Sequence, residues 1–142
     1  MWRAATPADD DAVVRLSLAL FTEDPSPEAV TEERIRRTLA TFRAEPLRGR
    51  TVVLDLDAHI AGYAFLPTYW SNELGGEICI VDELYVEPTS RNRGHASALL
   101  TSLRGGSVAL ELEVTPKNVH ARALYERLGF REKKNAVMRK KL

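Results

Sequence analysis

Several features that mark particular protein classes are scarce or missing in this sequence of 142 residues. Its single cysteine, Cys79, excludes a framework of intrachain disulfides and is typical of a reducing compartment. No apolar run approaches the roughly 20 residues that a membrane-spanning helix requires. The first residues, MWRAATPADDD, lack the basic and then apolar segments of a secretory signal. We therefore expect one cytoplasmic domain over residues 1–142, with no membrane partner.

An excess of charge of either sign is also missing, because 20 Lys and Arg balance 20 Asp and Glu to a formal net charge of +0. Proteins that bind nucleic acid without sequence preference, or that bind anionic membranes, usually carry a basic surplus. We therefore expect no nucleic-acid partner. The P-loop pattern and the dinucleotide pattern G-x-G-x-x-G do not occur. No grouping of His, Cys and Asp has metal-ligand spacing, so no metal is expected.

The order of patterned segments predicts a mixed α/β architecture of packed layers. Apolar residues recur at helical spacing from Ala8 onwards and again over residues 27–44. Two strands at 51–57 and 59–69 flank a tight turn at Asp57 and Ala58, and a long strand follows at 77–86. The sequence then predicts a helix, an alternating strand at 107–114 and a helix at 118–128. Short strands are expected at 1–6, 130–134 and 136–141.

The segment VEPTSRNRGHASALL, residues 86–100, places positive side chains and a glycine at the start of a helix. The first amides of a helix lack partners and attract anions. Gly94 allows close approach of a ligand, Ala96 adds little bulk, and Arg91 and Arg93 can bind phosphate. The alternative is that Gly94 only forms a turn and both arginines are solvated. Because the two common nucleotide patterns are missing, a phosphate site here would hold another ligand.

Within this segment, RNRGHA matches R/Q-x-x-G-x-G/A, the pyrophosphate-binding pattern of the GCN5-related N-acetyltransferase (GNAT) superfamily. VDELYVEP resembles the fourth strand of that family, and LELEVTPKNVHARALYERLGF resembles its fifth strand and the following helix. The resemblance covers about residues 77–130. It implies a mixed, mostly antiparallel sheet flanked by helices, with splayed fourth and fifth strands, and acetyl-CoA as the acyl donor. Ala96 replaces the second glycine of the pattern. His95 stands where an aliphatic residue is more usual; the alternative to a binding role for His95 is that it is an exposed residue without chemical function.

The resemblance also implies how the cofactor lies. The backbone of the fourth strand pairs with the pantetheine arm, the arginine-containing loop holds the diphosphate, and Asn118 contacts the arm from the other side of the splay. Asn118 also precedes a helix, where an asparagine can serve as N-cap. The cofactor-binding residues expected on this basis are Leu84, Tyr85, Val86, Arg91, Asn92, Arg93, Gly94, His95, Ala96, Ser97, Asn118 and Ala121.

Acetyl transfer to an amine needs a base, since an alkylamine with a pKa of about 10 is protonated at neutral pH, and an acid for the departing thiolate. The resemblance places Tyr125 near the thioester sulfur as that acid; packing on the helix face is the alternative. Asp82 and Glu83 interrupt an apolar strand, where unpaired carboxylates are costly. Neighbouring strand residues point to opposite faces unless a bulge intervenes. Glu83, which has the longer side chain, is the favoured base, and Asp82 is the second candidate. The alternative for both carboxylates is a structural ion pair with an arginine.

For the acceptor, Glu23 and Asp24 are candidates to attract a cationic amine, and Tyr69 and Trp70 to form an apolar or cation–π wall. The competing role of Asp24 is to form a turn before Pro25, and that of Trp70 is to cover the core. The sequence thus predicts an acetyl-CoA-dependent N-acetyltransferase that acts directly on a primary amine of a small molecule. A non-catalytic acyl-CoA-binding module and an acetyltransferase of protein N-termini or lysines are the alternatives. A homodimer through the last strands is compatible with this fold.

Overall fold

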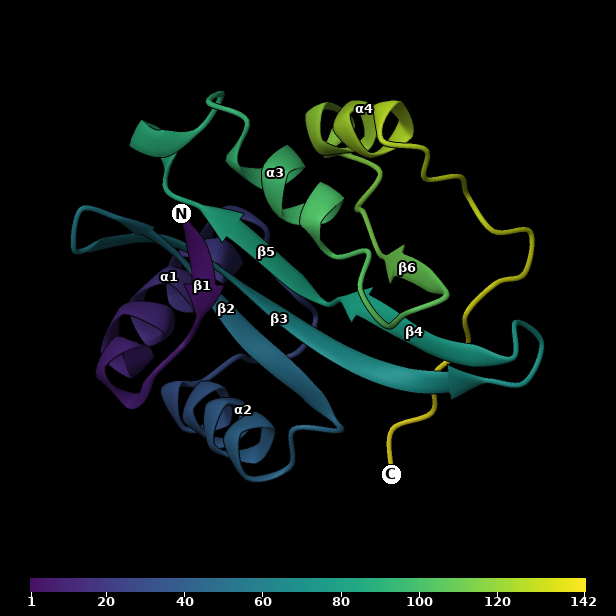
Figure 1. Ribbon diagram of the computed structural model, residues 1–142, viewed down its shortest axis with the longest axis horizontal. Helices are drawn as coiled ribbons and strands as arrows, with labels where there is room; N and C mark the ends of the chain where they lie inside the picture. The colour runs from purple at the N-terminus through teal and green to yellow at the C-terminus, as the bar shows by residue number, and fades with distance from the viewer.

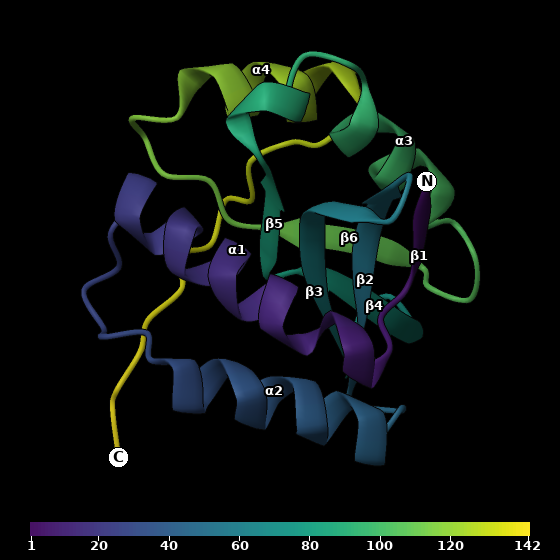
Figure 2. The same cartoon turned by 90° about the vertical axis from the view of Figure 1, so that its left-hand side faces the viewer.

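Strands from both halves of the chain form one six-stranded sheet, which lies between two layers of helices (Figures 1 and 2). The computed structural model describes residues 1–142. In chain order the elements are β1 (Trp2–Ala4), η1 (Pro7–Asp9), α1 (Asp10–Glu23), α2 (Glu32–Ala44), β2 (Gly49–Leu56), β3 (His59–Ser71), β4 (Gly76–Val81), β5 (Glu83–Val86), η2 (Pro88–Ser90), α3 (His95–Ser102), β6 (Ala109–Leu112) and α4 (Val119–Arg127).

The sheet is mostly antiparallel, as predicted. Its order is β1-β2-β3-β4-β6, and β5 pairs with β3 beside this path. Only β4 and β6 run parallel. The β2–β3 hairpin closes at Asp57 and Ala58, whose φ angles of 53° and 68° are those of a tight two-residue turn, again as predicted.

Strand alternation divides the core between the two faces of the sheet. On one face, Tyr63 and Phe65 of β3 pack with apolar residues of α1 and α2. On the other, Ala64 and Leu66 pack with Leu99, Leu100 and Leu103 from α3 and its end. Figure 2 shows these two helical layers on opposite sides of the strands. The helices are all too short or too polar to span a lipid bilayer.

The long strand predicted at 77–86 is divided by a bulge at Asp82. Thr68 lies opposite Cys79 in the β3–β4 pair, and this register would place Phe65 opposite Asp82. Instead Phe65 lies opposite Glu83, while the Asp82 N–H donates to the Phe65 carbonyl at 3.1 Å. One extra residue therefore turns Glu83 toward the α1 and α2 face, although Val81 packs on the α3 face.

The strands diverge beyond this bulge. β5 stays paired with β3, whereas β6 pairs only with β4, from Ile78↔Ala109 to Val81↔Leu112. The predicted splay between the fourth strand, here β4 and β5, and the fifth, here β6, is confirmed. It leaves one edge of β5 without a partner strand.

Two features of the expected secondary structure are wrong. The second helix begins at Glu32 rather than near residue 27, because the Thr31 hydroxyl caps it by accepting from the Arg34 N–H at 3.2 Å. The expected strands at 130–134 and 136–141 do not form. These segments are dominated by charged side chains and lack an alternating apolar face, so Val137 and Met138 stay exposed. Ion pairs such as Lys133–Glu111 hold the segment instead.

Gly62 controls the contact between β3 and β5. A Cβ at this position would lie 2.7 Å from the Tyr85 carbonyl oxygen and 3.3 Å from the Leu54 Cβ. We expect Gly62→Ala to lower the free energy of unfolding by about 1–3 kcal/mol in urea titrations, because β5 must move away from β3. Gly105→Ala is the matched control, since a Cβ there meets no atom within 4 Å, and it should change stability by less than about 1 kcal/mol. Equal effects of the two substitutions would contradict this account.

Candidate active site

A cleft of about 1530 Å³ opens where β5 diverges from β6, and it is walled by α3, α4 and the end of α1. The cleft brings together residues that are far apart in the sequence, and most of the residues predicted to bind cofactor line it. The predicted residues that line it are Glu23, Asp24, Leu84, Tyr85, Val86, Arg91, Asn92, Gly94, His95, Ala96, Ser97, Asn118, Ala121 and Tyr125. Arg93 is exposed and does not line it.

The loop at the start of α3 presents a run of free amides to this cleft. No N–H group from Asn92 to Ser97 donates a hydrogen bond within the protein; the first bonded amide is that of Ala98, which donates to the Gly94 carbonyl at 2.9 Å. Positive φ angles at Asn92 (61°) and Gly94 (79°) curve the backbone here. Successive amides in such a curved segment form a concave site for an anion, which the helix dipole reinforces.

The loop is fixed in place from the opposite side. The Trp2 indole N–H of β1 donates to the His95 carbonyl at 2.8 Å, which ties the first turn of α3 to the edge of the sheet. A Cβ on Gly94 would meet no protein atom within 4 Å. The space beside this glycine is therefore available to a ligand.

The free edge of β5 forms a second wall of the cleft. The Glu87 N–H donates to the Ala61 carbonyl of β3, so the hydrogen-bonding groups of Leu84 and Val86 point to the opposite edge. No strand covers that edge. The Val86 carbonyl is already occupied, since it accepts from Arg91 Nε at 2.7 Å.

Arg91 and Glu23 bind each other rather than standing free for a ligand. Arg91 pairs with Glu23 at 2.8 Å, and its guanidinium lies 5.2 Å from the centre of the Tyr85 ring. The Tyr85 hydroxyl also donates to Glu23 at 2.7 Å, and this hydrogen bond lowers the pKa of Glu23. The pairing links the end of α1 to the loop before α3 and neutralises the charge that we expected Glu23 to offer an amine.

On α4, local backbone structure places Tyr125 in the cleft. Asn118 caps the helix, because its Oδ1 accepts from the Ala121 N–H at 3.1 Å. At the other end the Phe130 N–H donates to the Tyr125 carbonyl at 3.0 Å, and the Phe130 ring packs edge-on against the Tyr125 ring at 5.8 Å. This is the Schellman arrangement with its usual apolar contact.

The Tyr125 hydroxyl has no hydrogen-bond partner in the protein, although Tyr125 is half-buried and lines the cleft. Burial raises the pKa of Tyr125. The phenol therefore stays protonated at neutral pH and is free to donate to a ligand.

The two candidate bases differ in their surroundings. Glu83 is half-buried on the α1 face and accepts hydrogen bonds from Tyr63 and Ser17. Asp82 is exposed at the bulge. Burial raises the pKa of Glu83, and the Tyr63 hydrogen bond opposes that rise. The pKa of Asp82 is raised as well, because surrounding protein atoms displace part of the water around its carboxyl although the side chain reaches the surface, and the Glu113 charge adds to the rise. Neither is held in an ion pair with an arginine.

Tyr69 and Trp70 lie outside the cleft. β3 is 13 residues long, and these residues occupy its far end, opposite Ile78 and Glu77 of β4. Trp70 is 70% exposed and covers no core. The length of β3 carries them past the splay, and their role as acceptor wall stays a prediction.

Other lining residues were not singled out by sequence patterns. Lys117, His120 and Arg127 bring positive charge or donor groups to the cleft from the loop before α4 and from α4 itself. Each looks ordinary in sequence, and only the folding of α4 over α3 gathers them beside the amide loop.

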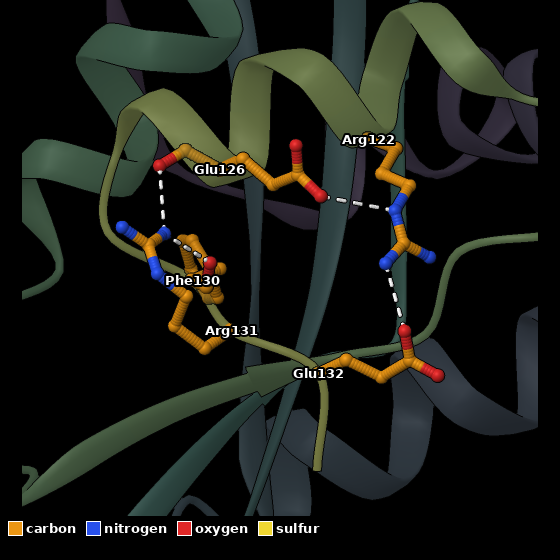
Figure 3. A pocket seen from close by; sticks show the side chains of 5 residues that line it. All are labelled: Arg122, Glu126, Phe130, Arg131 and Glu132. Carbon is orange, nitrogen blue, oxygen red and sulfur yellow. Dashed lines mark hydrogen bonds and ion pairs between the residues drawn. The ribbon is translucent and has the colours of Figure 1, made fainter.

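A smaller hollow of about 480 Å³ lies on the outer side of α4 (Figure 3). Arg122 bridges Glu126 at 3.0 Å and Glu132 at 2.7 Å, and Arg131 donates to the Glu126 carbonyl at 3.0 Å. These charges satisfy one another and hold the chain after Phe130 against α4. We therefore interpret these interactions as structural contacts that attach the C-terminal segment to α4.

Comparison with solved structures supports the fold described above. An integron cassette protein, HFX_CASS3, from the mobile metagenome of Cole Harbour Salt Marsh is 27% identical, with a TM-score of 0.82 over 99% of this chain and 90% of that one. A possible acetyltransferase from Clostridium difficile 630 has a TM-score of 0.86 at 18% identity, over 100% and 97% of the two chains. A predicted acetyltransferase from Clostridium acetobutylicum, solved with acetyl-CoA, has a TM-score of 0.80 at 19% identity, over 99% and 95%.

No curated protein matches this sequence. The profile of the Acetyltransferase (GNAT) family matches residues 13–130, which include the bulge, the amide loop and α4. This chain therefore belongs to the GNAT family of acetyltransferases.

Proposed function

We propose that the protein is an acetyl-CoA-dependent N-acetyltransferase that transfers the acetyl group directly to a primary amine of a small molecule while both substrates are bound. The observation that carries this proposal is the run of unpaired amides from Asn92 to Ser97 at the start of α3. Buried or clustered amides without partners are costly unless water or a ligand binds them. A diphosphate offers the acceptor oxygens that such a loop requires.

The remaining walls of the cleft fit the rest of coenzyme A. The pantetheine arm contains amides, and the uncovered groups of Leu84 and Val86 can pair with it as a neighbouring strand would. Asn118 and Ala121 face the arm from α4, with the Asn118 amide nitrogen left over after its capping bond. Lys117 and Arg127 supply positive charge for the phosphates. Arg91 orders the loop through Val86 and Glu23.

Acetyl-CoA supplies the acetyl group as a thioester. Tyr125 holds a proton on its hydroxyl, which has no partner in the protein and a pKa raised by burial, and donates it to the departing sulfur. On the other side of β5, Glu83 accepts a proton from the acceptor amine, directly or through water. Its raised pKa makes the carboxylate a stronger base. Asp82, one residue away, is the second candidate.

The acceptor is proposed to be a cationic small molecule. Glu23 is neutralised by Arg91, but Asp24 lines the cleft, and Asp82 and Glu113 lie exposed close to each other at the base of the splay. These carboxylates favour a protonated amine. A free Tyr125 hydroxyl and a half-buried Glu83 favour catalysis over simple binding of acyl-CoA.

The direct test is release of free thiol from acetyl-CoA in the presence of a panel of amines. We expect release with small di- and polyamines to exceed that with amino-acid amides that carry a single amine by at least about tenfold, since two or more properly placed carboxylates each contribute on the order of 1 kcal/mol. Acetylation of the amine is checked by mass spectrometry. Release with peptide N-termini or lysine peptides alone would instead support the protein-modifying alternative.

Gly94→Leu tests the diphosphate loop. The Gly94 φ of 79° disfavours any other residue by about 1–2 kcal/mol, and the new side chain would fill the space at the amides. We expect calorimetry to show loss of CoA binding by at least about 100-fold while the circular dichroism spectrum stays that of the folded protein. Gly105→Ala, outside the cleft, should bind CoA as the wild type does. Retained affinity in Gly94→Leu would contradict the assignment.

Tyr125→Phe tests the acid. The ring and its contact with Phe130 remain, so the affinity for CoA should change by less than about twofold. Turnover should fall by about 10²–10⁴-fold, the usual contribution of a general acid. Unchanged turnover would contradict the acid assignment: with unchanged CoA affinity the Tyr125 ring only packs, and with a large loss of CoA affinity the hydroxyl only binds the ligand.

A further inference from the structure

Glu83 is held by two hydroxyl groups that come from different layers of the fold. The Tyr63 hydroxyl of β3 donates to Glu83 Oε2 at 2.5 Å, and the Ser17 hydroxyl of α1 donates to the same oxygen at 3.2 Å. Tyr63 and Ser17 are both 0% exposed. Neither residue stands out in the sequence, where both fit an ordinary core position.

The two bonds leave the other carboxylate oxygen free. Glu83 Oε1 accepts no hydrogen bond from the protein. It is not a buried atom either, because the only buried side-chain polar atom without a partner is the Thr51 hydroxyl. Oε1 is therefore accessible to solvent even though Glu83 is only partly exposed. The carboxylate is anchored through one oxygen and presents the second.

We propose that Tyr63 and Ser17 are positioning residues for proton transfer: they fix Glu83 through Oε2 so that Oε1 faces the acceptor amine. This inference rests on the proposed function and deepens it, because it assigns a different role to each oxygen of the base: Oε2 is held by the protein and Oε1 accepts the proton. It also selects Glu83 over Asp82, since no side chain donates a hydrogen bond to Asp82.

The arrangement is more than a means of filling the core. The Tyr63 ring packs edge-on against Phe65 at 5.3 Å, and phenylalanine would keep that contact. The Tyr63 hydroxyl donates to the carboxylate, and the Ser17 hydroxyl lies beside both groups. A core that needed bulk alone would be more stable with phenylalanine and an apolar partner, because burying a phenol and a carboxyl costs free energy.

The groups around Glu83 also set its protonation. Burial raises the pKa of Glu83 and the Asp82 charge adds to the rise, while the hydrogen bonds from Tyr63 and then Ser17 oppose it. Burial and the neighbouring Glu83 charge raise the pKa of Tyr63 far above neutrality, so its hydroxyl keeps its proton and remains a donor. Removing the Tyr63 hydroxyl should therefore raise the pKa of Glu83 further.

The experiment is a carbon-13 NMR titration of the Glu83 carboxyl, assigned by its loss in Glu83→Gln, in wild type, Tyr63→Phe and Ser17→Ala. We expect the pKa of Glu83 to rise by about one unit in Tyr63→Phe, as for loss of a hydrogen bond to a charged group, and by less in Ser17→Ala, whose bond is longer. At neutral pH, kcat should fall by about tenfold in Tyr63→Phe, with CoA affinity within about twofold of wild type. If Tyr63→Phe does not fold, Ser17→Ala still tests the inference, because it should raise the pKa of Glu83 and lower kcat in the same directions.

Thr51→Val is the matched control, since it removes a buried hydroxyl of the neighbouring strand that has no hydrogen-bond partner. It should leave the Glu83 titration and kcat unchanged. An unchanged Glu83 pKa in both test variants, or a shifted pKa with unchanged kcat, would overturn the positioning role.

The titration separates this inference from the proposed function. If the wild type released no thiol with any amine, the proposed function would fail and the catalytic role of Tyr63 and Ser17 with it, even where the titration still shifted. If the wild type acetylates amines and the variants titrate and turn over as it does, only the positioning inference fails.

Discussion

The extra residue at Asp82 is the constraint on which the functional architecture depends. In the β3–β4 register Phe65 would lie opposite Asp82, whereas in the β3–β5 register it lies opposite Glu83. This shift turns Glu83 from the α3 face to the α1 face, where Tyr63 and Ser17 receive it. It also marks the point beyond which β6 no longer follows its neighbour, because β6 pairs only with β4. The position of the proposed base on one face and the open strand edge proposed for the cofactor thus arise from a single bulge.

The divergence opens the cleft and leaves backbone groups on two of its walls without hydrogen-bond partners. The β5 edge lacks a partner strand, and the loop before α3 lacks acceptors for its amides. Both walls are held firmly from behind, β5 by β3 and the α3 loop by Trp2 and the Arg91–Glu23 pair. Rigid positioning of unsatisfied groups is what a site for an extended, phosphorylated ligand requires.

Local patterns made much of this predictable from sequence. The loop at Gly94, the capping position of Asn118 and the carboxylates that interrupt an apolar strand are visible within short segments, and the structure places them around or beside one cleft. Contacts across the fold were not predictable in this way. Arg91 was expected at the phosphates but pairs with Glu23, 68 residues away in sequence. The length of β3, which places Tyr69 and Trp70 outside the cleft, was not visible in the sequence either. The last two strands do not form, because their charged residues give no apolar face.

The central claim is that main-chain amides between Asn92 and Ser97 bind the diphosphate of coenzyme A while the β5 edge binds its pantetheine arm. Titration of nitrogen-15-labelled protein with CoA, followed by amide chemical shifts, tests it most directly. The account predicts large shifts at residues 92–97 and at Leu84 and Val86 with CoA, and shifts at Leu84 and Val86 alone with pantetheine. Shifts confined to other surfaces, with residues 92–97 unmoved at saturating CoA, would contradict it.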